Sequence, residues 1–445
     1  AAPRERASAE LADTGAARFE LPKVRDFSRQ YSQLYFSRLQ AQRAALTARA
    51  NAQWAGLAER RVVDLGGDQG KGECYIVGTL FKKMKLKPQI LDEYLKDGLG
   101  DKGGSGLLSY VGEDDSVVLE ETTGRVSLIG DAVRIKSLVT GVVVAARGEV
   151  NRKGEFVLKE LLEPGTPPAP SLPMAEGEER YVALVSGLGV GAPGARPLEA
   201  QLLVDFLTGQ LGGDEERRLC SRVCRVVVAG NSVCAAGGVG AGGGASESSS
   251  SKREAPKLGA PIGELDLLLA ELASALPVDL MPGATDPANA ALPQQPMHAA
   301  LFPRAASYST FRCVTNPHEL KVGGAHLLGT AGQPLDDMAR MTEGQGRVEL
   351  LESSLKWRHL VPTAPDSLPS YPYSDDDPFV IAEAPHVLFA ANQPKFETKM
   401  VDGVRLVCVP DFSRTQQLVL LNLATLECRI MGFSTAAANA ADAAP

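Results

Sequence analysis

The residues best suited to catalysis or metal binding do not gather anywhere along this sequence. Five histidines are spread over its second half, and none forms a short cluster with a cysteine, an aspartate or a second histidine: His298, His318, His326, His359 and His386. A zinc site or a Ser/His/Asp triad needs several such groups together. Local spacing therefore predicts neither.

Two groups invite a metal-binding interpretation and fall short of it. Cys220, Cys224 and Cys234 come nearest to zinc spacing, but no fourth Cys or His lies close by, and Cys224 stands in an apolar run typical of a buried strand. The acidic run Asp375–Asp377 lacks the spaced oxygen ligands and glycine of a calcium loop. We interpret the cysteines as packed thiols and the acidic run as a solvated turn.

A glycine-rich loop follows a predicted strand and matches the Gly-x-Gly-x-x-Ala form of the dinucleotide-binding fingerprint at Gly187, Gly189 and Ala192. Asp205 stands further on as a candidate acid, but Pro193 and Pro197 occupy the first turns of the expected phosphate-binding helix. Such loops are common without a ligand, so a structural turn is the better interpretation.

A basic cluster comes at the end of another predicted strand and contains Lys82, Lys83, Lys85 and Lys87. In a barrel of the OB type, the first loop between strands commonly contacts nucleic acid, and a neighbouring aromatic such as Phe81 or Tyr75 would stack on a base. Aromatic residues make up only 5% of the chain, so stacking platforms are scarce. We expect at most a weak contact with single-stranded DNA; the alternative is a lysine-rich surface hairpin.

The elements that would position these residues change in character along the chain. Residues 1–26 lack periodicity and predict a loose tail. An amphipathic helix follows, with one face formed by Phe27, Tyr31, Leu34, Tyr35, Leu39 and Leu46. Its intervening polar positions include Arg29, Arg38, Arg43 and Arg49.

Residues 61–165 read as five short strands separated by glycine and charged turns: Cys74–Phe81, Val117–Glu121, Arg125–Ile129, Val139–Ala146 and Phe156–Leu161. A hairpin is expected around Asn151–Gly154. So many strands with little helix suit a small barrel such as an OB fold. The proline-rich stretch Pro164–Pro173 then predicts a stiff linker.

Beyond the linker, strand and helix patterns alternate. The predicted strands are Tyr181–Ser186, Val223–Ala229, Val278–Met281, Val322–Leu328, Val387–Phe389, Arg405–Val409 and Leu418–Leu421. The predicted helices are Leu198–Leu207, Ile262–Leu276 and Val348–Leu355, and a Gly/Ser tract lies at Ala235–Ser251. Because the late strands have no long helices between them, we expect an α/β domain with a partly antiparallel sheet.

Length and charge limit the possible functions. The 445 residues suffice for at least two domains, and no run of about 20 apolar residues suggests a membrane helix, so we expect a soluble protein. The net charge is −8, and the residues after 165 carry 21 basic and 31 acidic side chains. That sign opposes a large nucleic-acid groove. Seven scattered cysteines favour reduced thiols.

Longer motifs carry a resemblance that single residues do not. The run Tyr181–Gly191 (Tyr-Val-Ala-Leu-Val-Ser-Gly-Leu-Gly-Val-Gly) is followed in order by Gln201–Asp205, Thr208–Gly212, Val227–Asn231, Val278–Gly283, Asp286-Pro287, Leu292–Pro296, Thr315–Pro317, Pro362–Asp366 and Pro410–Ser413. Together with Phe27–Tyr31 and Val77–Lys82, these motifs resemble the small (B) regulatory subunits of eukaryotic DNA polymerase delta. The resemblance spans roughly Phe27 to Ile430.

The resemblance implies an OB fold joined to a calcineurin-like phosphoesterase domain. Active members of that superfamily hold two metals with aspartate and histidine at strand ends, whereas here those positions carry Ser186, Leu188, Asn231, Asp286 and Asn392. Asp286 is the one carboxylate. Without the other acidic and imidazole ligands, two neighbouring divalent cations would repel each other with too little compensating charge. We therefore expect a degenerate site without metal, cofactor or catalytic residues.

The resulting hypothesis is a noncatalytic, nuclear accessory subunit. Its expected partners are the cysteine-rich C-terminal module of the catalytic subunit and another accessory subunit, with no membrane contact. Expected domains are a tail and helix at 1–60, the OB fold at 61–165, and an inactive phosphoesterase-like domain at 175–445 with a low-complexity insertion at 235–257. The alternatives are an active metal-dependent phosphoesterase or nuclease and an OB-fold protein that binds single-stranded DNA.

Overall fold

The computed structural model describes residues 6–12, 16–26, 28–66, 72–88, 108–171, 179–234 and 259–435. Phe27 and the Gly/Ser tract lie outside these ranges. The chain forms two compact units: unit 1 contains residues 1–22, 169–333 and 385–445, and unit 2 contains residues 23–168 and 334–384. These units differ from the expected domains, because residues 334–384 group with the barrel and residues 1–22 with the C-terminal part of the chain.

Unit 2 is built on a closed barrel with the strand order β2-β3-β4-β6-β5. Its strands are β2 (Cys74–Lys83), β3 (Ser116–Glu121), β4 (Gly124–Ile129), β5 (Val143–Val150) and β6 (Phe156–Leu162). All five predicted strands are present, with the topology of an OB fold. β5 begins later than predicted because Gly141, at φ 88°, interrupts the extended backbone. The predicted hairpin turns at Asn151, whose N–H donates to the Glu155 carbonyl at 2.9 Å.

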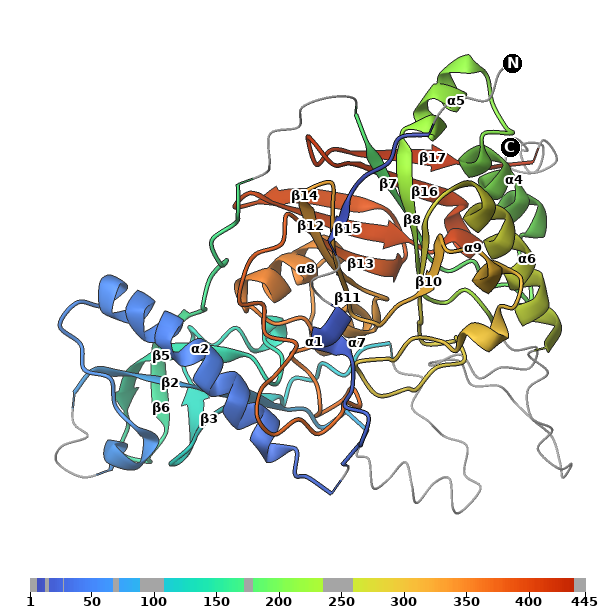
Figure 1. The fold of residues 1–445 in the computed structure, drawn as a ribbon. Helices are drawn as coiled ribbons and strands as arrows, with labels where there is room; N and C mark the ends of the chain where they lie inside the picture. The colour runs from blue at the N-terminus through green and yellow to red at the C-terminus, as the bar shows by residue number, and fades with distance from the viewer. Residues whose placement is uncertain are drawn as a thin grey trace, which may run out of the picture. The chain divides into compact units, whose positions relative to one another are not determined.

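Helix α2 (Ser32–Gln53) lies across the barrel, over β2 and β5 (Figure 1). Leu39, Leu46 and Ala50 pack with Tyr75 and Val77 in one apolar cluster. Burying leucine side chains of this kind stabilises the unit by about 1.5–3 kcal/mol each. The predicted amphipathic helix is thus confirmed, although Tyr31 precedes it and is exposed.

A buried arginine joins α2 to the second part of unit 2, which carries most of α7 (Gln333–Met341), all of α8 (Arg347–Lys356) and the irregular segment 357–384. Arg38 Nε lies 2.8 Å from Asp377 Oδ2, and both side chains are fully buried. The two Nη atoms donate to the carbonyls of Gly141, Pro362 and Ala364 at 3.0, 2.8 and 2.8 Å. Arg38, one of the polar positions of the predicted helix, is therefore a core residue.

Asp377 also departs from its predicted place in a solvated turn. Its Oδ2 accepts a hydrogen bond from His359 Nε2 at 2.9 Å, and its Oδ1 accepts from the Phe379 N–H at 3.0 Å. Burial alone would raise the pKa of this carboxyl, but the hydrogen bonds and charge of His359 and Arg38 hold it below its usual value. Of the acidic run, Asp375 and Asp376 are exposed and Asp377 is a core residue.

Unit 1 contains two six-stranded sheets. The first has the order β10-β9-β8-β7-β16-β17 and consists of β7 (Tyr181–Val185), β8 (Val223–Ala229), β9 (Val278–Met281), β10 (Phe311–Cys313), β16 (Gln417–Asn422) and β17 (Cys428–Gly432). The second has the order β1-β11-β12-β13-β15-β14 and consists of β1 (Leu11–Ala12), β11 (His318–Val322), β12 (Ala325–Thr330), β13 (Val387–Gln393), β14 (Glu397–Val401) and β15 (Val404–Pro410). Both sheets mix parallel and antiparallel pairs, as predicted.

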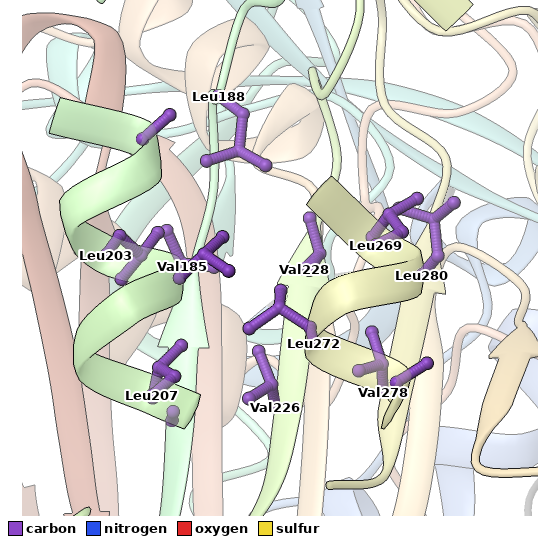
Figure 2. Close-up of a cluster of buried hydrophobic side chains, with 14 of the residues drawn as sticks. Val185, Leu188, Leu203, Leu207, Val226, Val228, Leu269, Leu272, Val278 and Leu280 are labelled. Atoms are coloured by element: carbon purple, nitrogen blue, oxygen red, sulfur yellow. The ribbon is translucent and has the colours of Figure 1, made fainter. Parts of the chain in front are cut away.

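Alternate side chains of the first sheet enter two different cores. Val185, Val226 and Val228 face the helices α4 (Pro197–Thr208) and α6 (Gly259–Ala275), from which Leu203, Leu207, Leu269 and Leu272 point back (Figure 2). Leu184, Val227 and Ala229 face the other sheet, where they meet Leu327, Phe389 and Val407. Burial on both faces explains why β8 is apolar at nearly every position. Short elements complete the unit: α5 (Asp214–Ser221), α9 (Phe412–Thr415), η4 (Ala299–Leu301) and η5 (Ala305–Ser307).

The N-terminal segment is part of unit 1, which corrects the predicted loose tail. β1 pairs antiparallel with β11, and α1 (Ala16–Phe19) ends at Phe19, which is fully buried. Arg6 donates to the carbonyls of Leu207 and Cys220, in the last turns of α4 and α5, and of Val223, at the start of β8, at 2.6–3.2 Å. A guanidinium satisfies helix C-terminal carbonyls well. The ordered segment is therefore held by hydrogen bonds and burial that composition did not reveal.

The strand predicted at Val322–Leu328 is two strands. Gly323 and Gly324, at φ 55° and 81°, form a tight turn between β11 and β12. Two consecutive residues at positive φ are typical of a two-residue hairpin loop, and glycine adopts them without steric cost. Among the described residues, no helix is both long and apolar enough to span a membrane.

Candidate functional site

The predicted phosphoesterase-like positions lie in unit 1, where β7, β8 and β9 reach their carboxyl ends. Ser186 directly follows β7, Asn231 lies just beyond β8, Asp286 stands in the loop after β9, and Asn392 belongs to β13. Asn392 N donates to Ser186 Oγ at 2.9 Å, so β7 and β13 meet at this edge. In open α/β sheets this edge is the usual place for a ligand.

The polar atoms at this edge are largely bonded to one another and to the backbone. Ser186 Oγ donates to the Pro410 carbonyl at 3.2 Å. Asn392 Nδ2 donates to the carbonyls of Ala229 and Ala331 at 3.1 and 2.9 Å. Asn231 Oδ1 accepts from the Thr285 N–H at 3.2 Å. These side chains therefore tie strand ends together.

Asp286 is buried and anchors two loops. Its Oδ1 accepts from the Val233 N–H at 2.9 Å and its Oδ2 from the Gly283 N–H at 2.8 Å. Burial raises the pKa of Asp286 to about 6, although the backbone N–H groups of Val233 and Gly283 oppose this rise. Both carboxylate oxygens already serve the fold.

Leu188 does not join the other four positions. It is buried in the apolar cluster beneath α4 and α6, and Figure 2 shows it beyond the end of β7, above Val185 and Val228. An apolar side chain at this place adds to the core. Leu188 therefore contributes no polar group to the edge where the other four predicted positions lie.

The glycine loop after β7 is closed against the loop after β8. Gly187 N donates to the Gly230 carbonyl at 2.9 Å, Gly189 N to Asn231 at 3.1 Å, and Val190 N to Ser232 at 2.9 Å. A phosphate-binding loop needs such N–H groups for its ligand. These N–H groups are already bonded to backbone carbonyls, which argues against dinucleotide binding. The candidate acid Asp205 accepts a hydrogen bond from Gln201 on the same helix at 3.0 Å.

Sequence reasoning missed Asp411 at this edge. A Cβ atom on Gly187 would stand 2.7 Å from Asp411 Cγ, so only glycine permits the observed approach. Asp411 caps α9, since its Oδ1 accepts from Ser413 N at 2.9 Å. Asp411 lies in the motif Pro410–Ser413, one of those that carry the resemblance, and this motif was the signal for it.

The glutamine and asparagine motifs form a second network beside Asp286. Gln294 Nε2 donates to the Gly283 carbonyl at 3.0 Å, and its Oε1 accepts from Asn316 Nδ2 at 2.7 Å and from Gln333 Nε2 at 2.9 Å. Asn316 Oδ1 in turn accepts from Ala331 N at 2.9 Å. Fully bonded amides of this kind fix one arrangement of buried loops. The motifs therefore support the edge structurally.

The other candidates from the sequence are dispersed. Cys220 Sγ lies 2.9 Å from the Leu207 carbonyl and Cys224 Sγ 3.3 Å from that of Tyr181, and burial raises the pKa of both thiols, that of Cys224 to about 11. They are packed thiols, as expected. Over the ranges that the structure describes, no three or more His, Cys, Asp or Glu side chains group so that they could hold a metal ion.

The predicted DNA contact of the lysine cluster is wrong for Lys82. Lys82 is buried, with Nζ 2.6 Å from the Met341 carbonyl, and desolvation lowers its pKa to about 8. Lys85 pairs with Asp114 at 2.7 Å and Lys87 with Asp366 at 2.5 Å. Lys82 therefore cannot reach a phosphate, and two of the remaining lysines have carboxylate partners that reduce their attraction for DNA.

Replacing Asp286 with alanine should destabilise the protein most at acid pH. The protonated carboxyl is favoured in the folded state, because its pKa there is about 6 against 3.8 for an ordinary aspartate. The stability it contributes is present below pH 3.8 and is lost as the pH rises through 6, a change of about 2–3 kcal/mol. Calorimetric unfolding between pH 4.5 and 7.5 measures this difference; exposed Glu264→Ala is the control. A pH-independent difference would contradict the assignment.

Comparison with known proteins covers nearly the whole chain. The family described as "DNA polymerase delta subunit OB-fold domain" matches residues 30–161, and the family of the B subunits of DNA polymerases alpha and epsilon matches residues 182–398. The "DNA polymerase delta small subunit" of Arabidopsis thaliana is 43% identical over 426 residues, covering 94% of each chain. That of Saccharomyces cerevisiae is 32% identical, covering 91% of this chain and 89% of the yeast chain. A "DNA polymerase II small subunit" from Methanothermobacter thermautotrophicus is 25% identical, covering 69% of this chain and 65% of that one.

Proposed function

Because the chain belongs to the family of DNA polymerase delta small subunits and is an accessory subunit of that polymerase, we propose that it is noncatalytic and holds other subunits together. Its partners are the cysteine-rich C-terminal module of the catalytic subunit and a further accessory subunit. It acts in the nucleus during replication and repair synthesis. The phosphoesterase-like region serves this role as a rigid body whose ancestral site is degenerate.

The observation that carries the noncatalytic assignment is the use of the polar groups at the strand ends. Asp286 accepts two backbone hydrogen bonds, and Ser186 and Asn392 bond to each other and to nearby carbonyls. A two-metal site needs several carboxylate and imidazole ligands directed at the ions. Of the five predicted positions only Asp286 is a carboxylate, and both of its oxygens already accept backbone hydrogen bonds. Ser186, Leu188, Asn231 and Asn392 add neither a negative charge nor an imidazole.

We expect the purified protein to bind far less than one equivalent of manganese, zinc or iron and to leave phosphodiesters intact when manganese is added. The reason is the absence of imidazole and the engagement of Asp286 at the predicted positions. Metal analysis of the purified protein and a fluorogenic phosphodiester assay make the test, with an active metallophosphoesterase as the positive control. Stoichiometric metal together with turnover would reject the noncatalytic assignment.

The scaffold role predicts a gain in stability on binding. A ligand that binds only the folded state raises stability in proportion to the logarithm of its concentration over Kd, by about 2.7 kcal/mol at 100 times Kd. The catalytic subunit's cysteine-rich module should therefore raise the melting temperature of this chain in a concentration-dependent way. A module with its cysteines replaced by serine is the control.

Repeating the melting experiment at low and high salt distinguishes an apolar interface from an electrostatic one. The residues after 165 carry 31 acidic and 21 basic side chains, and an interface that is mainly apolar should respond only modestly to salt. We expect similar shifts at low and high ionic strength. No shift at saturating module would reject the scaffold role, whereas a shift abolished by salt would replace the apolar interface with an electrostatic one.

A further inference from the structure

One serine of unit 2 is followed in sequence by three acidic residues, and a basic side chain donates a hydrogen bond to its hydroxyl. Ser374 is followed by Asp375, Asp376 and Asp377. It is partly exposed, and Arg29 Nη1 donates a hydrogen bond to its Oγ. We propose that Ser374 is a phosphorylation site for an acidophilic serine/threonine kinase and that Arg29 holds the phosphate.

The kinase can read two of the three aspartates. The Asp375 side chain is 93% exposed, and Asp376 is exposed as well, so both carboxylates at the first and second positions after the serine are accessible. Asp377, at the third position, is fully buried against Arg38. Recognition in the folded protein therefore rests on Asp375 and Asp376, and we expect a lower rate than for a free peptide of the same sequence.

The reaction is an ordinary phosphoryl transfer. Ser374 Oγ forms a bond to the γ-phosphorus of ATP, and the bond from that phosphorus to the β,γ-bridging oxygen breaks, with its electron pair leaving on ADP. The hydroxyl proton passes to the catalytic base of the kinase. The product carries about −1.5 to −2 charges and three acceptor oxygens in place of one neutral hydroxyl.

The surroundings of Ser374 determine what that charge does. Arg29 is half-exposed and also lies 3.7 Å from Asp375 and 3.3 Å from Asp26, so it now shares its charge among weak surface contacts. A phosphate is a stronger partner for a guanidinium than a hydroxyl is. The backbone carbonyl of Ser374 also accepts from Ser37 Oγ at 3.3 Å, which places the turn beside α2. Helix α2 has no acidic residue in its first turn, so an anion near its start meets little repulsion from the helix.

The first test treats the whole folded chain with casein kinase 2, ATP and Mg²⁺ and maps phosphate by peptide mass spectrometry. Mapping is necessary because Ser251 also precedes an acidic residue, Glu254, by three positions. We expect phosphate on Ser374 and no phosphate on the corresponding peptide of Ser374→Ala. Combining Asp375→Asn with Asp376→Asn should lower the rate of Ser374 phosphorylation several-fold. Ser370, buried and without acidic neighbours, is the internal control. Labelling of a 369–380 peptide but not of Ser374 in the folded chain would overturn the proposal.

The second test isolates Arg29. Phosphorus NMR titration of the phosphorylated protein gives the second pKa of phosphoserine, ordinarily near 6. A neighbouring guanidinium favours the dianion, so this pKa should be lower in the wild type than in Arg29→Gln by about half a unit or more. Labelling of Arg29→Gln should persist, since the substitution leaves the acidic residues intact. Equal pKa values in both proteins would overturn the role of Arg29.

Discussion

Arg38→Met is expected to lower the free energy of unfolding of unit 2 by about 3–5 kcal/mol, the usual cost of removing one partner of a buried ion pair. The substitution removes the guanidinium from Asp377, which keeps its hydrogen bond with His359. It also leaves the Gly141, Pro362 and Ala364 carbonyls without their donor. Arg38→Lys should cost nearly as much, because a single ammonium cannot reproduce the planar fork of the guanidinium.

Tryptophan fluorescence makes the measurement specific. The chain has two tryptophans, Trp54 and Trp357, and both belong to unit 2. Urea unfolding followed by their emission therefore reports on this unit. Gln40→Met changes an exposed residue two positions along α2 and should be neutral. A loss below about 1 kcal/mol for Arg38→Met would show that the buried pair contributes no more than a surface one.

The barrel with its helix, residues 23–168, should fail to fold when expressed alone. Unit 2 is completed by residues 334–384, and several of its buried contacts cross from one part to the other. Arg38 reaches Pro362 and Ala364, Lys82 reaches Met341, and Trp357 Nε1 donates to Glu163 at 2.8 Å. Without the second part, the fragment loses these buried contacts and exposes the apolar surface that they cover, so the closed barrel should not form stably.

Co-expression supplies the control for that fragment. Residues 334–384, provided as a separate chain, should restore a dispersed NMR spectrum and a cooperative melting transition to residues 23–168. An equally long polypeptide in which Asp377 and Trp357 are replaced by alanine should not. A dispersed spectrum and cooperative unfolding of residues 23–168 alone would show that the barrel is an independent domain.

Elements with strong periodicity were predictable from sequence. The barrel strands, β7 to β9 and α6 follow from alternation and helical spacing, because each buries a regular set of side chains. The role of Arg38 was not predictable in this way. Its partner Asp377 lies 339 positions away. A charged residue in an amphipathic pattern is also normally solvated, so only the fold could show that this one is buried.

The candidate site was also predictable only in part. The resemblance predicted positions at Ser186, Asn231 and Asp286, which follow three neighbouring parallel strands and therefore lie at one edge of the first sheet. Asn392 belongs to the other sheet and reaches this edge through its hydrogen bond to Ser186. The resemblance could not show that Leu188 belongs to the core, or that Asp411 approaches Gly187 closely. The burial of Lys82 and the pairing of Lys87 could not be predicted from spacing, because their partners Met341 and Asp366 lie 259 and 279 positions away along the chain.

Because the segments of the two units alternate along the chain, both units must wait until late in synthesis to complete their folds. Unit 2 lacks residues 334–384 until all of the segment 169–333 has been made, and β7 must wait for its neighbour β16, near the end of the chain. Neither unit can finish folding on a short nascent chain. A long-lived, partly folded chain exposes apolar strand surface, the state that chaperones bind. Slowing elongation should therefore do little to help this protein fold, whereas raising chaperone levels during expression should increase the soluble yield.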